Sequence, residues 1–118
     1  MSFFDQIFGK PAPTLNALEL NEKIKNGRRP LVIDVRQPDE YRSGHIAGAK
    51  LIPLGELNRR IQELPQDKEI VCVCASGNRS GSATRMLIGA GFNAVNMKGG
   101  MMAWRQASFQ VKKGEAAS

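Results

Sequence analysis

The strongest constraint on the fold lies in residues 70–84, where a short apolar run gives way to a loop of small and polar residues. The run 70–73 is β-branched or small at every position, which is typical of a strand buried on both faces. Cys-Ala-Ser-Gly-Asn-Arg-Ser follows and leads into a helical pattern. In open α/β sheets, ligands bind where such a strand ends. We therefore expect any chemistry of this chain at Cys74.

The loop after Cys74, residues 75–79, has the composition of an anion-binding site; we call it the Cys74 loop. Gly77 permits a tight curl, and without proline every residue keeps a backbone N–H donor. These amides, the following helix terminus and the charge of Arg79 favour thiolate over thiol, and such surroundings lower a cysteine pKa to roughly 3.5–7.5. We also expect Cys74 to be exposed, so that no desolvation penalty opposes the shift. The candidate substrate-binding residues are Ala75, Ser76, Gly77, Asn78 and Ser80.

The second cysteine, Cys72, falls inside the predicted strand and is interpreted as a small buried hydrophobic residue. Two cysteines at alternate positions of one strand lie about 6.5 Å apart at their Cα atoms, too far along a rigid strand for an easy disulfide. No signal-like segment is evident. These observations predict a location in the reducing cytoplasm.

Further motifs lie at 32–36 (Val-Ile-Asp-Val-Arg), 40–49, 52–53, 74–80 and 99–104 (Gly-Gly-Met-Met-Ala-Trp). With these motifs the chain resembles the rhodanese-like family of single-domain sulfurtransferases, over about residues 14–106. Strands and helices also alternate along the sequence, which predicts a parallel sheet covered by helices on both faces. The expected fold is therefore a single α/β domain of the rhodanese-like type.

This resemblance implies a sulfurtransferase that carries sulfane sulfur as a persulfide on Cys74. The donor would be a small anion such as thiosulfate, or a persulfide, and the acceptor a thiol or cyanide; a protein could serve as either partner. Arg79 would act with the cysteine, and Asp34 and Arg36 would support the site. Many relatives active on thiosulfate have a basic residue where this chain has Ala75. The choice of donor therefore stays open, and no cofactor or metal is expected.

Two other functions remain open from the sequence. The first is a non-catalytic module that uses the same pocket to bind an anion or a partner. The second is a cysteine-dependent phosphatase or arsenate reductase. Four residues separate Cys74 from Arg79, whereas five separate the two residues in the phosphatases that the loop resembles. A shorter loop favours a single sulfur atom over a phosphoryl group.

The predicted domain occupies residues 14–107, between an N-terminal extension, 1–13, and a polar C-terminal tail, 108–118, expected to fray. The extension carries one apolar face, too short to span a membrane, formed by Phe3, Phe4, Ile7 and Phe8. We expect this face to pack on the domain, with docking onto a partner or a membrane surface as the alternative. The net charge of +6 is scattered along the chain, which favours small anions over nucleic acid.

Periodicity and breaker residues place the remaining elements. The predicted strands are 31–35, 49–52, 70–73 and 94–97, and the predicted helices are 17–26, 38–42, 54–64, 80–90 and 99–104. Asn16 and Glu19 have the spacing of a helix-capping box. His45 and Glu40 are interpreted as structural, because thiolate attack on sulfur needs no proton abstraction.

Overall fold

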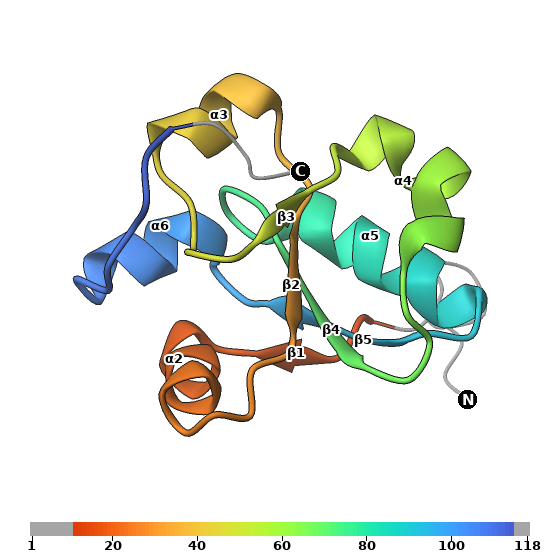
Figure 1. Cartoon of the computed structure of the whole chain (residues 1–118), viewed down its shortest axis with the longest axis horizontal. Coiled ribbons are helices and arrows are strands. Elements are labelled where there is room, and N and C mark those ends of the chain that lie inside the picture. Colours follow the sequence, from red (N-terminus) through yellow and green to blue (C-terminus); the bar gives the residue numbers. More distant parts are fainter. Residues whose placement is uncertain (1–10, 115–118) are drawn as a thin grey trace.

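The computed structural model describes residues 11–114, which form a five-stranded parallel sheet in the order β1-β5-β4-β2-β3 (Figure 1). The strands are β1 (Thr14–Leu15), β2 (Leu31–Asp34), β3 (Lys50–Leu51), β4 (Glu69–Val73) and β5 (Asn93–Met97). Four of the five were predicted. β1 was missed, because two residues are too short to show a period; β1 pairs with β5 through Thr14 and Asn96.

Helices cover both faces of the sheet, as predicted (Figure 1). They are α2 (Ala17–Lys25), α3 (Pro38–Ser43), α4 (Leu54–Arg60), α5 (Asn78–Gly89) and α6 (Gly100–Gln106). The capping box at the start of α2 is confirmed, since Asn16 and Glu19 exchange backbone-to-side-chain hydrogen bonds of 2.9 and 2.8 Å. The expected helix 54–64 is instead α4 followed by a 3₁₀ turn, Ile61–Glu63.

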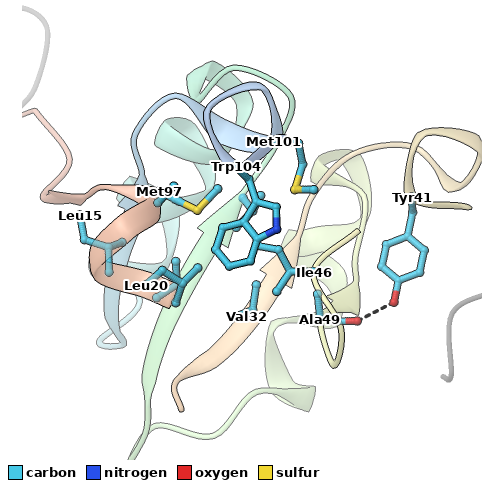
Figure 2. Packing of buried hydrophobic residues seen from close by; sticks show 12 residues of the cluster. Leu15, Leu20, Val32, Tyr41, Ile46, Ala49, Met97, Met101 and Trp104 are labelled. Carbon is cyan, nitrogen blue, oxygen red and sulfur yellow. Dashed lines mark hydrogen bonds between the residues drawn. The ribbon is translucent and has the colours of Figure 1, made fainter. Parts of the chain in front are cut away.

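The sheet separates two apolar cores because successive side chains of a strand point to opposite faces. On one face, Trp104 of α6 lies among residues of α2, β2 and β5, as Figure 2 shows for Leu20, Val32 and Met97. On the other face, α4 and α5 contribute apolar side chains that pack on β2 and β4. That second core includes Leu57, Leu87, Ile33, Ile70, Cys72 and Cys74.

The segment after α6 packs against the domain in its described part, so the expectation of a frayed tail is wrong for residues 108–114. Phe109 meets Trp104 edge to face at 5.0 Å between ring centroids. Lys112 forms an antiparallel bridge with His45, with backbone hydrogen bonds of 2.8 and 2.9 Å. Residues 108–114 thus pack beside α3 and α6.

The prediction for the apolar face of residues 1–10 lies outside the described residues. Among the residues that are described, none of the helices combines the length and the apolar character that crossing a bilayer requires.

Candidate active site

Cys74 follows directly on β4, the middle strand of the sheet, at its carboxyl end. The chain then turns back on itself, and α5 begins at Asn78, two residues earlier than predicted. Gly77 makes this turn possible, because its φ of 107° is a left-handed value that other residues rarely adopt. The Cys74 loop is therefore a tight ring that opens directly into a helix.

Hydrogen-bond donors surround the Cys74 sulfur. The Gly77 amide donates to Sγ at 3.1 Å, and the Ser80 hydroxyl lies 3.2 Å from it. The backbone amides of Ser76 and Ser80 also favour the anion. The predicted cradle of amides is thus present, although the helix supplies part of it.

Cys74 is buried, with 1% of its surface exposed, so the expectation of an exposed thiol is wrong. Burial is the largest single influence on its pKa and raises it, because a low-dielectric site disfavours the charged form. Hydrogen bonds from Ser80, Gly77 and Ser76 outweigh that effect, and the pKa of Cys74 falls below its ordinary value of 9.0. The site therefore favours a thiolate through donors rather than through exposure.

Asn96 of β5 also contacts the Cys74 loop, although the sequence did not point to it as a site residue. Its Nδ2 donates to the Gly77 carbonyl at 3.0 Å, and its Oδ1 lies 2.6 Å from Ser80 Oγ. One signal in the sequence could have found it. A polar side chain in the middle of a buried strand must find partners, since an unpaired buried amide is costly.

The start of α6 closes the ring from the other side. The Met101 amide donates to the Cys74 carbonyl at 2.8 Å, and the Met102 amide donates to the Ala75 carbonyl at 3.0 Å. Gly100 lies so close that a Cβ there would stand 2.4 Å from the Cys74 carbonyl oxygen. Gly99-Gly100 was read only as a helix start, but Gly100 also permits this close approach.

Arg79 binds Glu40 of α3 through both terminal nitrogens, at 2.8 and 2.9 Å. This pairing lowers the pKa of Glu40 from 4.5 to about 2, with the Arg79 hydrogen bond as the main cause. The expected free charge on the loop is therefore a neutralised ion pair. Glu40 ties α3 to α5, which agrees with the structural role expected for it.

Asp34 and Arg36 lie on one face at the end of β2, as the alternation predicted, and bind each other. Arg36 donates to the Asp34 carboxylate at 2.7 and 2.9 Å and to the Gly44 carbonyl at 2.8 Å. The pair is almost fully buried. Asp34 thus holds Arg36 in place beside Ala75 in the cleft described next.

A cleft of about 480 Å³ lies beside the Cys74 loop. It is lined by Arg36, Glu40, Ser43, Ala75, Met101, Met102, Arg105 and Gln106. Arg105, whose guanidinium reaches the Gly44 carbonyl at 3.5 Å, was not anticipated from the sequence. The cleft thus combines an apolar wall from α6 with arginine side chains, a lining that suits a small anion with some apolar surface.

Two other features lie away from the cysteine. A cavity of about 320 Å³ lies between α2, Trp104 and the C-terminal segment, and neither cysteine lines it. His45 is buried, its Nδ1 is 2.8 Å from the Tyr41 carbonyl oxygen, and its ring stacks on Tyr41 at 3.6 Å. Within residues 11–114, no three His, Cys, Asp or Glu side chains gather as a metal would require.

The fold is a parallel α/β domain, and its site is a cysteine in an amide-lined loop at the end of the middle strand. These features define a class of α/β proteins with a candidate cysteine nucleophile. Comparison with known proteins then identifies the family. The family model described as "Rhodanese-like domain" matches residues 16–107, and the chain belongs to this family. It is 39% identical over 90 residues to the putative sulfurtransferase YtwF of Bacillus subtilis, covering 76% of this chain and 87% of that protein.

Solved structures agree with this assignment. A rhodanese-related protein from Thermoplasma volcanium superposes with a TM-score of 0.79 at 37% identity, covering 85% of this chain and 97% of that one. A thiosulfate sulfurtransferase from Pseudomonas aeruginosa gives a TM-score of 0.81 at 28% identity, over 89% of this chain but only 21% of its own. A relative named as a sulfurtransferase is therefore similar to this chain in sequence, and a solved structure with that name is similar to it in fold.

Proposed function

We propose that this protein transfers sulfane sulfur through a persulfide on Cys74. The observation that carries the proposal is the ring of donors around the Cys74 sulfur, with the Gly77 amide at 3.1 Å and Ser80 Oγ at 3.2 Å. A buried thiol without such donors would stay protonated near neutral pH. The neighbouring cleft offers room for a small donor and acceptor.

The reaction has two displacement steps. In the first, the Cys74 thiolate attacks the outer sulfur of the donor; a new S–S bond forms, the donor's own bond to that sulfur breaks, and its electron pair leaves with sulfite or a thiolate. In the second, a thiolate or cyanide attacks the terminal sulfur, and Cys74 leaves as a thiolate. Neither step needs an external oxidant, and neither needs a general base once the thiolate exists.

The loop residues divide the work. The amides of residues 75–79 stabilise the charge that the terminal sulfur carries, as donors stabilise an oxyanion. Arg79 braces the loop against α3 through Glu40. Asp34 and Arg36 support the cleft wall beside Ala75.

The donor is thiosulfate or a small persulfide that carries a negative charge. Ala75, directly after the cysteine, offers no side-chain cation, and Arg79 of the loop is already paired with Glu40. Arg105, which lines the cleft, supplies a positive charge farther from the Cys74 sulfur. A protein donor or acceptor would use the same opening, and two free cysteines suit the reducing cytoplasm that the sequence predicts.

The test is the intact mass of the protein after incubation with thiosulfate, before and after a wash with a thiol. We expect a gain of one sulfur atom that the thiol removes, and the same result in the matched variant Cys72→Ala. Cys74→Ser should gain nothing and should lower thiosulfate:cyanide transfer roughly a thousandfold or more. A protein that takes up no sulfur from thiosulfate or from a small persulfide would be a binding module instead.

The phosphatase alternative is tested beside it with an aryl phosphate. Four residues between Cys74 and Arg79 make a ring that suits one sulfur atom, and both terminal nitrogens of Arg79 already bind Glu40. We expect sulfur transfer without phosphate release. A glycine inserted after Ser76 should weaken sulfur transfer, and phosphate hydrolysis by the native loop without persulfide formation would reverse the assignment.

A further inference from the structure

The Ser80 hydroxyl lies between two hydrogen-bond acceptors, and it has only one proton to donate. Ser80 Oγ is 3.2 Å from Cys74 Sγ and 2.6 Å from Asn96 Oδ1. Ser80 is fully buried and Asn96 is 7% exposed, so water offers little help in satisfying either side chain. A hydroxyl donates one hydrogen bond and accepts others. It can therefore serve only one of these two acceptors at a time.

The Gly77 carbonyl fixes which end of the Asn96 amide faces Ser80. A carbonyl oxygen only accepts hydrogen bonds, so the Asn96 amino group must point to Gly77, at 3.0 Å. The amide oxygen then faces Ser80 Oγ. Two oxygens 2.6 Å apart need a proton between them, and Asn96 Oδ1 has none to give. Ser80 therefore donates its hydroxyl proton to Asn96 unless a stronger acceptor competes for it.

When the Ser80 hydroxyl donates its hydrogen bond to Asn96, a lone pair of Oγ faces Cys74. That lone pair can accept a hydrogen bond from the S–H of a thiol. A thiolate has no proton and binds a donor instead. We propose that Asn96 is a positioning residue that sets the direction of the Ser80 proton: the hydroxyl donates to Asn96 Oδ1 while Cys74 is a thiol, and turns to Sγ when Cys74 ionises.

The switch conserves atoms and charge. The thiol proton passes to solvent, the hydroxyl rotates about its C–O bond, and no other covalent bond breaks. The 2.6 Å contact between Ser80 Oγ and Asn96 Oδ1 then lengthens, because no proton lies between the two oxygens. In a persulfide the Cys74 Sγ is neutral, because the terminal sulfur carries the charge, so the hydroxyl returns to Asn96. This last consequence rests on the proposed function; the switch itself needs only the ionisation of Cys74.

Other charged groups around Cys74 do not titrate together with it, so they do not hide the rotation of the Ser80 hydroxyl. Arg79 from α5, with Glu40 from α3, faces the loop. Arg36, just after β2, and Arg105 from α6 line the cleft, and Asp34 at the end of β2 pairs with Arg36. Arginines keep their charge in proteins. The pKa of Glu40 is lowered to about 2 and that of Cys72, two residues before Cys74, is raised to about 11, whereas the pKa of Cys74 is lowered from 9.0.

The first test follows the side-chain amide of Asn96 by NMR as the pH is raised. We expect its resonances to titrate with the midpoint that iodoacetamide alkylation gives for Cys74, because Oδ1 loses its donor. In Ser80→Ala the cysteine still ionises, but the Asn96 response should fall severalfold. A flat Asn96 signal in the native protein, or an equal response in Ser80→Ala, would overturn the proposal.

The second test is a double-mutant cycle on the alkylation rate below that midpoint. Removing the Ser80 hydroxyl should slow alkylation about tenfold in Asn96→Ala, where sulfur has the proton to itself. The factor should be clearly smaller in native protein, where Asn96 competes. Asn93→Ala, an exposed change on the same strand, should leave the Ser80→Ala factor unchanged. Equal factors in both backgrounds would show that no proton is shared.

Both tests remain decisive if one variant folds poorly. Should Asn96→Ala not fold, Asn96→Leu removes the same acceptor at nearly the same side-chain volume, and the Ser80→Ala factor should again be larger than in native protein; an equal or smaller factor overturns the proposal. The NMR test uses only the native protein and Ser80→Ala. No measurement here involves a sulfur donor, so failure of the switch and failure of sulfur transfer are distinguishable.

Discussion

Cys72 and Cys74 lie two residues apart on one face of the sheet, and both are closed to solvent, at 0% and 1% exposure. Their acidities nevertheless move in opposite directions. Burial raises the pKa of Cys72 to about 11, with one opposing hydrogen bond from Thr84. Burial also raises the pKa of Cys74, but four hydrogen bonds from the loop and helix reverse the shift.

The difference teaches that the end of the strand, rather than access to water, creates the reactive thiol. Inside β4 the backbone amides around Cys72 are engaged with neighbouring strands, for example in the pairing with Ile33. Beyond Val73 the chain leaves the sheet, and amides such as that of Gly77 turn toward the sulfur. Two residues of chain thus separate an inert cysteine from a candidate nucleophile.

The largest expected effect is the contrast in alkylation of the two thiols. In native protein at pH 8, iodoacetamide should label Cys74 more than about a hundredfold faster than Cys72, because their thiolate fractions differ at least that much. Peptide mapping by mass spectrometry measures both sites. In urea the two rates should converge, and faster labelling of Cys72 in the folded protein would contradict the contrast.

The next effect concerns the backbone that supports Cys74 but not Cys72. Gly100 has a φ of 58°, and a Cβ there would stand 2.4 Å from the Cys74 carbonyl oxygen and 2.6 Å from the Ala75 carbonyl carbon. Gly100→Ala should lower the free energy of unfolding by about 2–4 kcal/mol in urea titrations.

The matched control is Gly89→Ala, at the end of α5. Nothing lies within 4 Å of its added Cβ, and the change should be neutral or stabilise by up to about 1 kcal/mol. Similar losses from Gly100→Ala and Gly89→Ala would mean that α6 does not hold the loop.

Much of this arrangement could be predicted from sequence, because local patterns specify local structure. The run 70–73 predicted the middle strand, Gly77 predicted the turn, and the alternation of Asp34 and Arg36 placed both on one face. The family resemblance then supplied the parallel fold, which the structure and the comparisons confirm.

What the sequence could not supply were contacts between distant segments. The Arg79–Glu40 pair joins residues 39 positions apart, and the Asn96–Ser80 contact spans 16. The start of α6 contacts Cys74, whose carbonyl accepts a hydrogen bond from the Met101 amide 27 positions away. No periodicity encodes such contacts, so the exposure of Cys74 was predicted wrongly and the pairing of Arg79 with Glu40 was not predicted.

A moderate effect is expected from the ion pair that braces the loop. The folded-state pKa of Glu40, about 2, lies below its ordinary 4.5. The pair therefore stabilises the fold fully above about pH 4.5, and this contribution is lost as the pH falls through 2. Both side chains are about one-third exposed, so we discount for solvent and expect about 1–2 kcal/mol.

Glu40→Gln should lower the free energy of unfolding by that amount at pH 7 and flatten its pH dependence between 4.5 and 2. The control is Glu63→Gln, since the pKa of Glu63 is equally lowered, mainly by Arg60 and then by Lys50, but its side chain is more exposed, at 43% against 33% for Glu40. Glu63→Gln should lower the free energy of unfolding less than Glu40→Gln does. The reverse ranking in urea titrations at several pH values would remove Glu40 from the support of the loop.

The smallest effect is expected at Arg105, which tests whether charge in the cleft matters as the amides at the sulfur do. Arg36 and Arg79 are neutralised by Asp34 and Glu40, whereas Arg105 donates to the Gly44 carbonyl, which carries no full charge. If sulfur transfer occurs as proposed, Arg105 attracts the anionic donor without touching the thiolate.

Arg105→Ala should therefore raise KM for thiosulfate about two- to fivefold, the range of an exposed charge contact of about 0.5–1 kcal/mol, with kcat unchanged. Added salt should shrink the difference, because screening weakens exposed charges. Arg59→Ala, at an exposed residue of α4 whose guanidinium binds Glu56, is the matched control and should leave KM unchanged. A fall in kcat, or a difference that persists at 1 M salt, would place Arg105 in contact with the reacting sulfur and make the cleft and the amide ring one site.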